Sequence, residues 1–104
     1  MRNFLIVLSL AAAATAAQAA NATAGKTAYD KSCKSCHGPD GTANPAIAKM
    51  FKVDIKDLKS PDVQAESDDD LVKIITDGKG KMKPVASASS SAADIVAYVR
   101  TWKK

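Results

Sequence analysis

The chain has 104 residues, of which 15 are Lys or Arg and 11 are Asp or Glu, for a formal net charge of +4. This basic excess is mild and no basic run contains interleaved aromatic residues, so the composition does not indicate a nucleic-acid-binding protein. A chain of this length forms a single domain with a small core, and such domains commonly need a disulfide, a metal or a cofactor for stability.

The first 19 residues differ in composition from the rest of the chain. Arg2 provides a positive charge, the apolar run FLIVLSLAAAATAA follows, and small residues lead to Ala17-Gln18-Ala19. This order is typical of a secretory signal peptide, and the apolar run is shorter than the roughly 20 residues that span a bilayer. We therefore expect residues 1–19 to be removed, residues 20–104 to form the mature domain, and the protein to be periplasmic or otherwise exported. A retained membrane anchor is the alternative.

Helical patterns dominate the residues that follow, and there is almost no strand pattern. A first helix is predicted from about residue 22 to residue 35. It carries Gly25, Tyr29 and Cys33 at intervals of four, which places them on one face. Glycine is unfavourable inside a helix, so Gly25 is either a tolerated defect or the place where a second helix crosses closely beside Tyr29.

The stretches between helices are rich in turn-forming residues. GPDGTANP, residues 38–45, predicts a loop, and the short apolar pieces AIAKMF and VDIKDL predict one or two brief helices. KSPD at residues 59–62 predicts a break, and DGKGKMKPVASASSS at residues 77–91 predicts a long loop. Loops this long in so small a domain need something to pack against, and a large buried cofactor is one candidate.

Two further helices have clear start signals. The earlier one begins at Ser67, with an acidic residue three positions on, and stops at Gly78. The last helix begins at Ser91, again with an acidic residue, Asp94, three positions on. The apolar faces consist of Leu71, Ile74 and Ile75 in the earlier helix and of Ile95, Tyr98, Val99 and Trp102 in the last. Together the patterns predict an all-α domain of about four helices.

Residues 33–37 read CKSCH and contain both cysteines and the single histidine of the chain. Cysteines of an exported protein can form a disulfide, but redox sites of this spacing accompany βαβ patterns, and the sequence has none. A structural zinc site usually takes four Cys or His ligands, and this cluster offers three. C-x-x-C-H is the attachment signature of c-type haem. We therefore expect one covalently attached haem, with Cys33 and Cys36 forming thioethers to its two vinyl groups and His37 binding the iron.

The second axial position of such an iron has few candidates. His37 is the only histidine, so methionine, lysine or an open site remains. Met50 lies in an apolar segment, where methionine ordinarily fills gaps in a core. Met82 lies in a loop rich in Gly, Lys and Pro, which can present its sulfur to the iron. We therefore favour Met82 over Met50 as the second ligand.

Three segments resemble those of the class I c-type cytochromes of the small bacterial kind, and the likeness covers nearly all of the mature chain. GKTAYDKSCKSCHG (residues 25–38) is similar to the first helix of the family, DIVAYVRTW (94–102) to its last helix, and GKMKPV (80–85) to the loop with the methionine ligand. The resemblance implies the cytochrome c fold, about four helices around one haem. The first and last helices would then cross, and the residues at the crossing would be Gly25, Tyr29, Ile95 and Tyr98.

The resemblance also implies roles for the prolines and for the site. It assigns the iron to His37 and Met82, with a proline carbonyl accepting the other N–H of His37. Pro45 is the first candidate for that carbonyl and Pro39 the second. In many relatives a proline follows the methionine ligand at once, whereas here Pro84 comes two residues after Met82.

A class I c-type cytochrome is a soluble electron carrier and not an enzyme, because a filled coordination sphere leaves no position for a substrate. Lys79, Lys81 and Lys83 are either ordinary solvated charges or a basic rim that attracts an acidic redox partner. We expect redox proteins as partners, acidic or membrane-bound, with no nucleic acid and no membrane insertion after signal cleavage, and a monomer. The alternatives are an enzyme or sensor with a vacant or labile sixth site, and a haem-free zinc or disulfide module.

Overall fold

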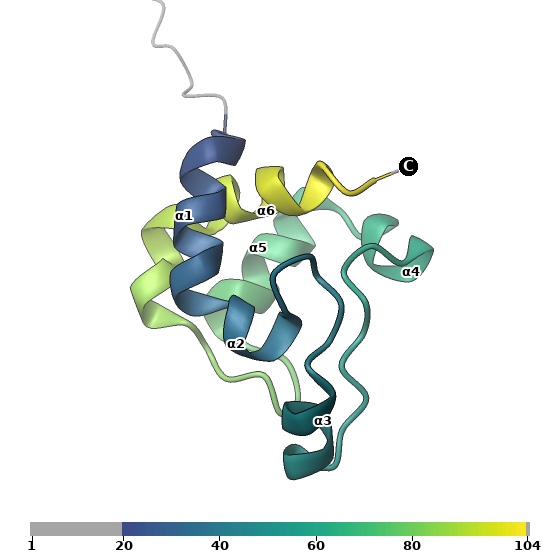
Figure 1. Ribbon diagram of the computed structural model, residues 1–104. Coiled ribbons are helices and arrows are strands. Elements are labelled where there is room, and N and C mark those ends of the chain that lie inside the picture. Colours follow the sequence, from purple (N-terminus) through teal and green to yellow (C-terminus); the bar gives the residue numbers. More distant parts are fainter. Residues whose placement is uncertain (1–19, 104) are drawn as a thin grey trace, which may run out of the picture.

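The computed structural model describes residues 20–103, and within that range its regular structure is helical apart from an isolated bridge between Lys79 and Met82. The α-helices are α1 (Ala22–Ser32), α2 (Lys34–His37), α3 (Pro45–Phe51), α4 (Pro61–Gln64), α5 (Asp68–Asp77) and α6 (Ala92–Arg100), and η1 (Ala86–Ser91) is a 3-10 helix (Figure 1). The predicted all-α fold is therefore confirmed. The predicted signal peptide, residues 1–19, lies outside the described residues.

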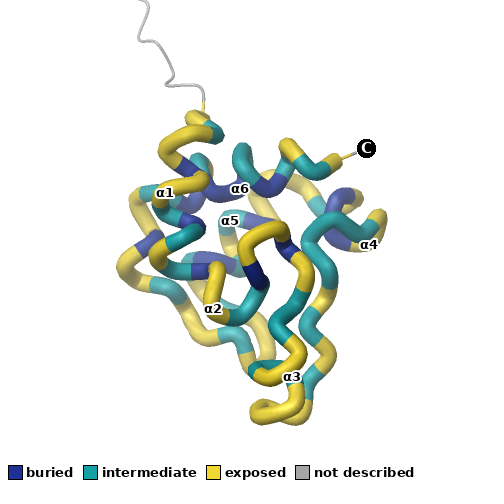
Figure 2. Tube along the Cα trace, in the orientation of Figure 1, coloured by how far each residue is buried: buried dark blue, intermediate teal, exposed yellow. Residues whose placement is uncertain are grey.

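The core lies where α6 and η1 pack against α1 and α5, and Figure 2 shows buried positions gathered there and a further buried stretch on α4. Its members are Tyr29, Cys33, Val63, Leu71, Ile75, Ala88, Ala92, Ile95, Val96 and Val99. Helix α3, by contrast, has no buried residue. No helix between residues 20 and 103 has the length and the apolar character that crossing a membrane requires.

Helices α1 and α6 cross with their backbones in contact at Gly25. A Cβ atom built on Gly25 would lie 1.9 Å from the carbonyl oxygen of Asp94, so no side chain fits there. Tyr29, one turn later, is fully buried, and its ring packs edge-on against Tyr98 at a centroid distance of 5.4 Å. Of the two interpretations of Gly25, the close crossing is therefore the correct one.

Several predicted helix boundaries are confirmed and several are wrong. Ser67 caps α5, since its Oγ accepts the Asp70 N–H at 3.1 Å, and Gly78 ends that helix with a φ of +80°. The first helix ends at Ser32 instead of residue 35, because the backbone of Cys33 departs from helical geometry before α2 begins. Of the two short apolar pieces for which one or two brief helices were predicted, AIAKMF lies in α3 and VDIKDL forms no helix, so one brief helix is confirmed.

The predicted break at residues 59–62 is confirmed for Lys59 and Ser60 and ends earlier than predicted, because α4 begins at Pro61. Ser60 caps this short helix and Pro61 is its first residue, a position where a missing N–H costs nothing. The predicted cap at Ser91 is absent, since Ser91 ends η1 and makes no side-chain cap bond. The Asp94 carboxylate accepts the Asn21 N–H at 2.8 Å instead, which fixes the start of α1 on α6.

Candidate functional site

The C-x-x-C-H motif occupies one tight turn at the junction of α1 and α2. The carbonyl of Cys33 accepts the N–H groups of Cys36 at 3.2 Å and His37 at 2.9 Å. Both cysteines are free thiols, Cys33 buried and Cys36 half-buried. Burial, and secondly the nearby Cys36, raise the pKa of Cys33 to about 11, so this thiol stays protonated at neutral pH. The turn therefore holds two thiols and an imidazole on five consecutive residues.

His37 carries a neutral imidazole at physiological pH, because burial lowers its pKa. Neutral imidazole is the form that binds a metal. Its Nδ1 is buried and has no hydrogen-bond partner among residues 20–103. The expectation that the carbonyl of Pro45 or Pro39 accepts this N–H is therefore not met. Pro45 is the first residue of α3, so its carbonyl points along that helix toward the helix's own N–H groups.

Asn44 connects the motif to α3, a role that the sequence analysis missed. Its backbone N–H donates to the Cys36 carbonyl at 2.9 Å, and its side-chain Nδ2 donates to the Ser35 carbonyl at 3.1 Å. Its Oδ1 accepts the Ala46 N–H at 3.0 Å and so caps α3. The sequence signal for the cap was present, as Asn directly before Pro45 at the helix start. The bonds to Cys36 and Ser35 join residues eight and nine positions apart in the chain, so no local sequence pattern predicts them.

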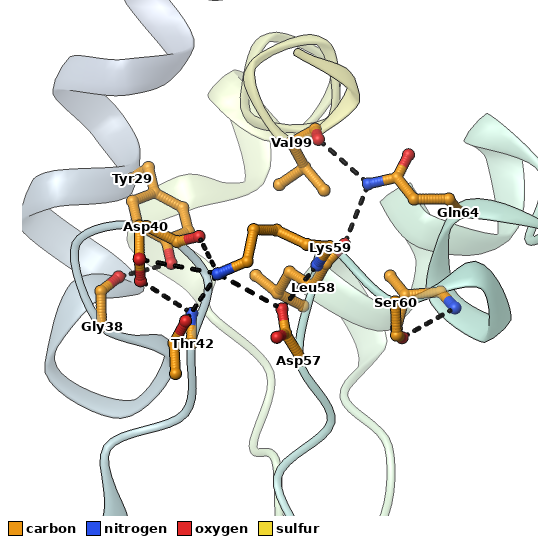
Figure 3. A network of polar contacts seen from close by, with 11 residues as sticks. Tyr29, Gly38, Asp40, Thr42, Asp57, Leu58, Lys59, Ser60, Gln64 and Val99 are labelled. Carbon is orange, nitrogen blue, oxygen red and sulfur yellow. Dashed lines mark hydrogen bonds and ion pairs between the residues drawn. The ribbon is translucent and has the colours of Figure 1, made fainter. Parts of the chain in front are cut away.

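The loop after the motif is held from two sides, as Figure 3 shows. The Tyr29 hydroxyl donates to the Gly38 carbonyl at 2.6 Å, and burial raises the pKa of this phenol. On the other side Lys59 donates to Thr42 Oγ1 at 2.5 Å and lies 3.5 Å from the Asp40 carboxylate. The Thr42 N–H, and then Lys59, lower the pKa of Asp40. These contacts fix where the chain goes after His37.

Met82 lies at the end of a tight turn in the loop between α5 and η1. The Lys79 N–H donates to the Met82 carbonyl at 2.9 Å, the Met82 N–H donates back at 3.0 Å, and Gly80 takes a φ of +58° at the tip. At the base, a Cβ on Gly78 would lie 2.6 Å from the Met82 carbonyl oxygen and 2.8 Å from Pro84 Cδ. Pro84 therefore packs over Gly78, which explains how a proline two residues after Met82 fits this loop.

The structure places the two candidate methionines in different surroundings. Met82 is partly buried and packs against the core cluster that includes Cys33. Met50 is 65% exposed near the end of α3, so the expectation that it fills a core gap is wrong. In Figure 1, α2, α3 and the loop between α5 and η1 all lie in the lower half of the molecule.

These residues fit a covalently bound haem. The motif turn carries two free thiols and a neutral imidazole, the donor set that a covalently bound haem requires. The thioether of Met82 lies against the same core as Cys33. Among residues 20–103, no three His, Cys, Asp or Glu side chains are grouped as a metal site would require.

Comparisons with known proteins agree with this fit. Residues 20–100 match the family model described as cytochrome c oxidase, cbb3-type, subunit III. A solved structure described as KustC0563 c-type cytochrome is 26% identical, with a TM-score of 0.64, and the match covers 77% of this chain and 98% of that chain. No curated protein matches the chain.

The helical fold, the C-x-x-C-H turn and these matches define a small c-type cytochrome, a class that transfers electrons through a covalently bound haem. The chain belongs to the family described as cytochrome c oxidase, cbb3-type, subunit III, because the model of that family matches most of its length.

Proposed function

We propose that this protein is a soluble periplasmic electron carrier and not an enzyme. One haem c is attached through Cys33 and Cys36, and His37 and Met82 are the axial ligands of its iron. The observation that carries this proposal is the position of Met82, partly buried against the core that contains Cys33, while Met50 is exposed.

Haem supplies an iron that exchanges one electron between its ferrous and ferric states. The residues of the chain set the conditions for that exchange. Cys33 and Cys36 would hold the group against loss, and the neutral imidazole of His37 and the thioether of Met82 would each donate a lone pair to the iron. Methionine and histidine ligation raises the reduction potential, as does a buried site of low dielectric.

The exposed lysines of the Met82 loop favour an acidic redox partner. Lys79, Lys81 and Lys83 flank or form the turn that ends at Met82, and all three are exposed. Such a basic surface accelerates encounter with a negatively charged protein. An electron carrier must also dissociate quickly, so the interface with a soluble or membrane-bound partner is small and weak, and the carrier itself is a monomer.

An optical spectrum of the purified protein tests the ligand set. We expect low-spin ferric iron with an iron–thioether charge-transfer band, and a ferrous form that does not readily bind carbon monoxide. High-spin iron in the unaltered protein would overturn the carrier proposal and favour an enzyme or sensor with an open sixth position.

Mass spectrometry of the exported protein tests the attachment and the processing. We expect residues 20–104 plus the mass of one haem. An unmodified mass would exclude covalent haem and leave a zinc or disulfide module.

A further inference from the structure

Helix α2 is a single turn of four residues, Lys34–His37, and it carries Cys36 and His37. A helix this short has almost no stability of its own, because helix formation needs more than one turn to offset the cost of nucleation. Its last carbonyls also lack partners within the helix. The position of α2 must therefore be fixed by groups outside it.

Asn44 satisfies two of those carbonyls at once. Its backbone N–H bonds the Cys36 carbonyl and its Nδ2 bonds the Ser35 carbonyl, at 2.9 and 3.1 Å. The Gly38 N–H bonds the Lys34 carbonyl at 2.8 Å, so a third carbonyl of the turn is satisfied by the chain itself. Since Asn44 also caps α3, one residue ends α2 and begins α3.

The place of the His37 ring depends on where α2 lies, because His37 is the last residue of that helix. A metal-ligating histidine must be held in place by the groups around it. The two bonds from Asn44 hold the α2 backbone at the residues directly before His37.

We propose that Asn44 is a positioning residue for the axial histidine, through its side-chain bond to the Ser35 carbonyl. This inference rests on the proposed function, in which His37 binds iron. The competing interpretation is that Asn44 only caps α3. The two side-chain bonds use different atoms. Nδ2 donates to the Ser35 carbonyl of α2, which we call the clamp, and Oδ1 accepts the Ala46 N–H and caps α3. A substitution can therefore remove one bond and keep the other.

The test uses the haem-containing protein and three variants. Asn44→Ser keeps a side-chain oxygen that can cap α3, but its hydroxyl lies one bond closer to the backbone than Nδ2 and does not reach the Ser35 carbonyl. Asn44→Ala removes both side-chain bonds, and Ser67→Ala removes a helix cap from α5, away from the motif. The readout is the set of hyperfine-shifted His37 ring signals in the NMR spectrum of the ferric protein, because these shifts depend on the orientation of the ligand at the iron.

We expect Asn44→Ser and Asn44→Ala to shift the His37 ring signals by similar amounts, and the two proteins to differ in thermal stability. We expect Ser67→Ala to lower the melting temperature and leave the ring signals unchanged. Ring signals in Asn44→Ser at their wild-type positions would overturn the proposal and leave Asn44 as a cap. Absence of His37 ring signals from the wild-type protein would instead contradict the assignment of His37 as a ligand.

A measurement on the unaltered protein completes the test and does not depend on the folding of a variant. The side-chain NH₂ of Asn44 should exchange with solvent more slowly than that of Asn21, whose side chain acts only as an acceptor among residues 20–103. Equal exchange rates for the two amides would overturn the proposed clamp.

Discussion

Tyr29 ties α1 to the residue that directly follows the C-x-x-C-H motif. Its ring is fully buried, edge-on to Tyr98 and to Trp102 at centroid distances of 5.4 and 5.5 Å. Its hydroxyl donates to the carbonyl of Gly38, which is itself buried. The phenyl ring therefore belongs to the core, while the hydroxyl satisfies an acceptor that water does not reach.

Tyr29→Phe should lower the free energy of unfolding by about 1–3 kcal/mol, because the Gly38 carbonyl would be left buried without its donor. Chemical denaturation of the haem-containing protein measures this loss. Tyr98→Phe is the matched control, since the Tyr98 hydroxyl makes no hydrogen bond within residues 20–103. Equal losses in the two variants would contradict the assigned bond.

The stability of the protein should also fall at alkaline pH through Tyr29. Burial raises the pKa of this phenol in the folded state, whereas the unfolded chain releases the proton near pH 10. The contribution of Tyr29 to stability is therefore fully present below about pH 10 and is lost as pH rises toward the folded pKa. Denaturation of wild type and Tyr29→Phe at several pH values should show the stability gap narrowing above that pH; a constant gap would contradict it.

The two methionines provide a direct test of the ligand set. Met82→Ala should remove the iron–thioether band, allow carbon monoxide to bind the ferrous protein and lower the reduction potential. Met50→Ala should keep all three properties and cost little stability, because the Met50 side chain is 65% exposed. Loss of the band in Met50→Ala would reverse the ligand choice.

At the scale of elements, the crossing of α1 and α6 positions the motif. Gly25 brings the two backbones into contact, and the Asp94 carboxylate accepts the Asn21 N–H at the start of α1. The motif turn begins where α1 ends, so the direction of α1 across α6 determines where Cys33 and α2 lie. A change at the crossing therefore reaches the haem site through the axis of α1.

Gly25→Ala should destabilise the protein by about 3 kcal/mol, the upper range for overpacking, since the new Cβ would overlap the Asp94 carbonyl. A melting curve measures the loss. Lys31→Ala, an exposed change on the same helix, should stay within about 0.5 kcal/mol of wild type. A Gly25→Ala protein as stable as wild type would show that the helices can separate at no cost.

At the scale of the whole molecule, opposite charges gather in different segments. Three exposed lysines lie on the Met82 loop. Acidic residues cluster instead at the start of α5, where Asp68, Asp69 and Asp70 are consecutive and Asp68 pairs with Arg100 at 2.9 Å. This separation allows the basic loop to act as an electrostatic guide even though the net charge of the chain is only +4.

Replacing Lys79, Lys81 and Lys83 together by Gln should slow electron transfer to an acidic partner at low salt. The difference from wild type should shrink as salt rises, because the screening length falls to about 10 Å at 0.1 M. Stopped-flow kinetics at several ionic strengths measure both effects. The control replaces Lys31, Lys73 and Lys103, exposed lysines elsewhere, by Gln. If both triple variants slow electron transfer equally, the net charge of the protein and not a docking surface on the Met82 loop controls the rate.

Features that depend on residues within a turn or two of each other were predictable from the sequence. The Ser67 cap, the stop at Gly78 and the C-x-x-C-H motif are of this kind, because their chemistry is contained in three to five consecutive positions. The all-α class followed from the same local patterns. The close crossing at Gly25 was one of two interpretations, and the structure decided it because the second helix lies about 70 residues away in the chain.

Features that depend on distant partners needed the tertiary structure. The predicted Ser91 cap was wrong because Ser91 ends η1, and the Asp94 carboxylate bonds Asn21 from the other end of the described chain. The predicted hydrogen bond from His37 to a proline carbonyl is absent because Pro45 begins a helix. The bond from Asn44 to the Ser35 carbonyl could not be predicted, because its partners lie nine residues apart in the chain. By itself the sequence determined which residues can bind a haem, since that is a property of consecutive side chains. Only the tertiary structure decided how they are held, because short turns take their positions from the groups that satisfy their free carbonyls.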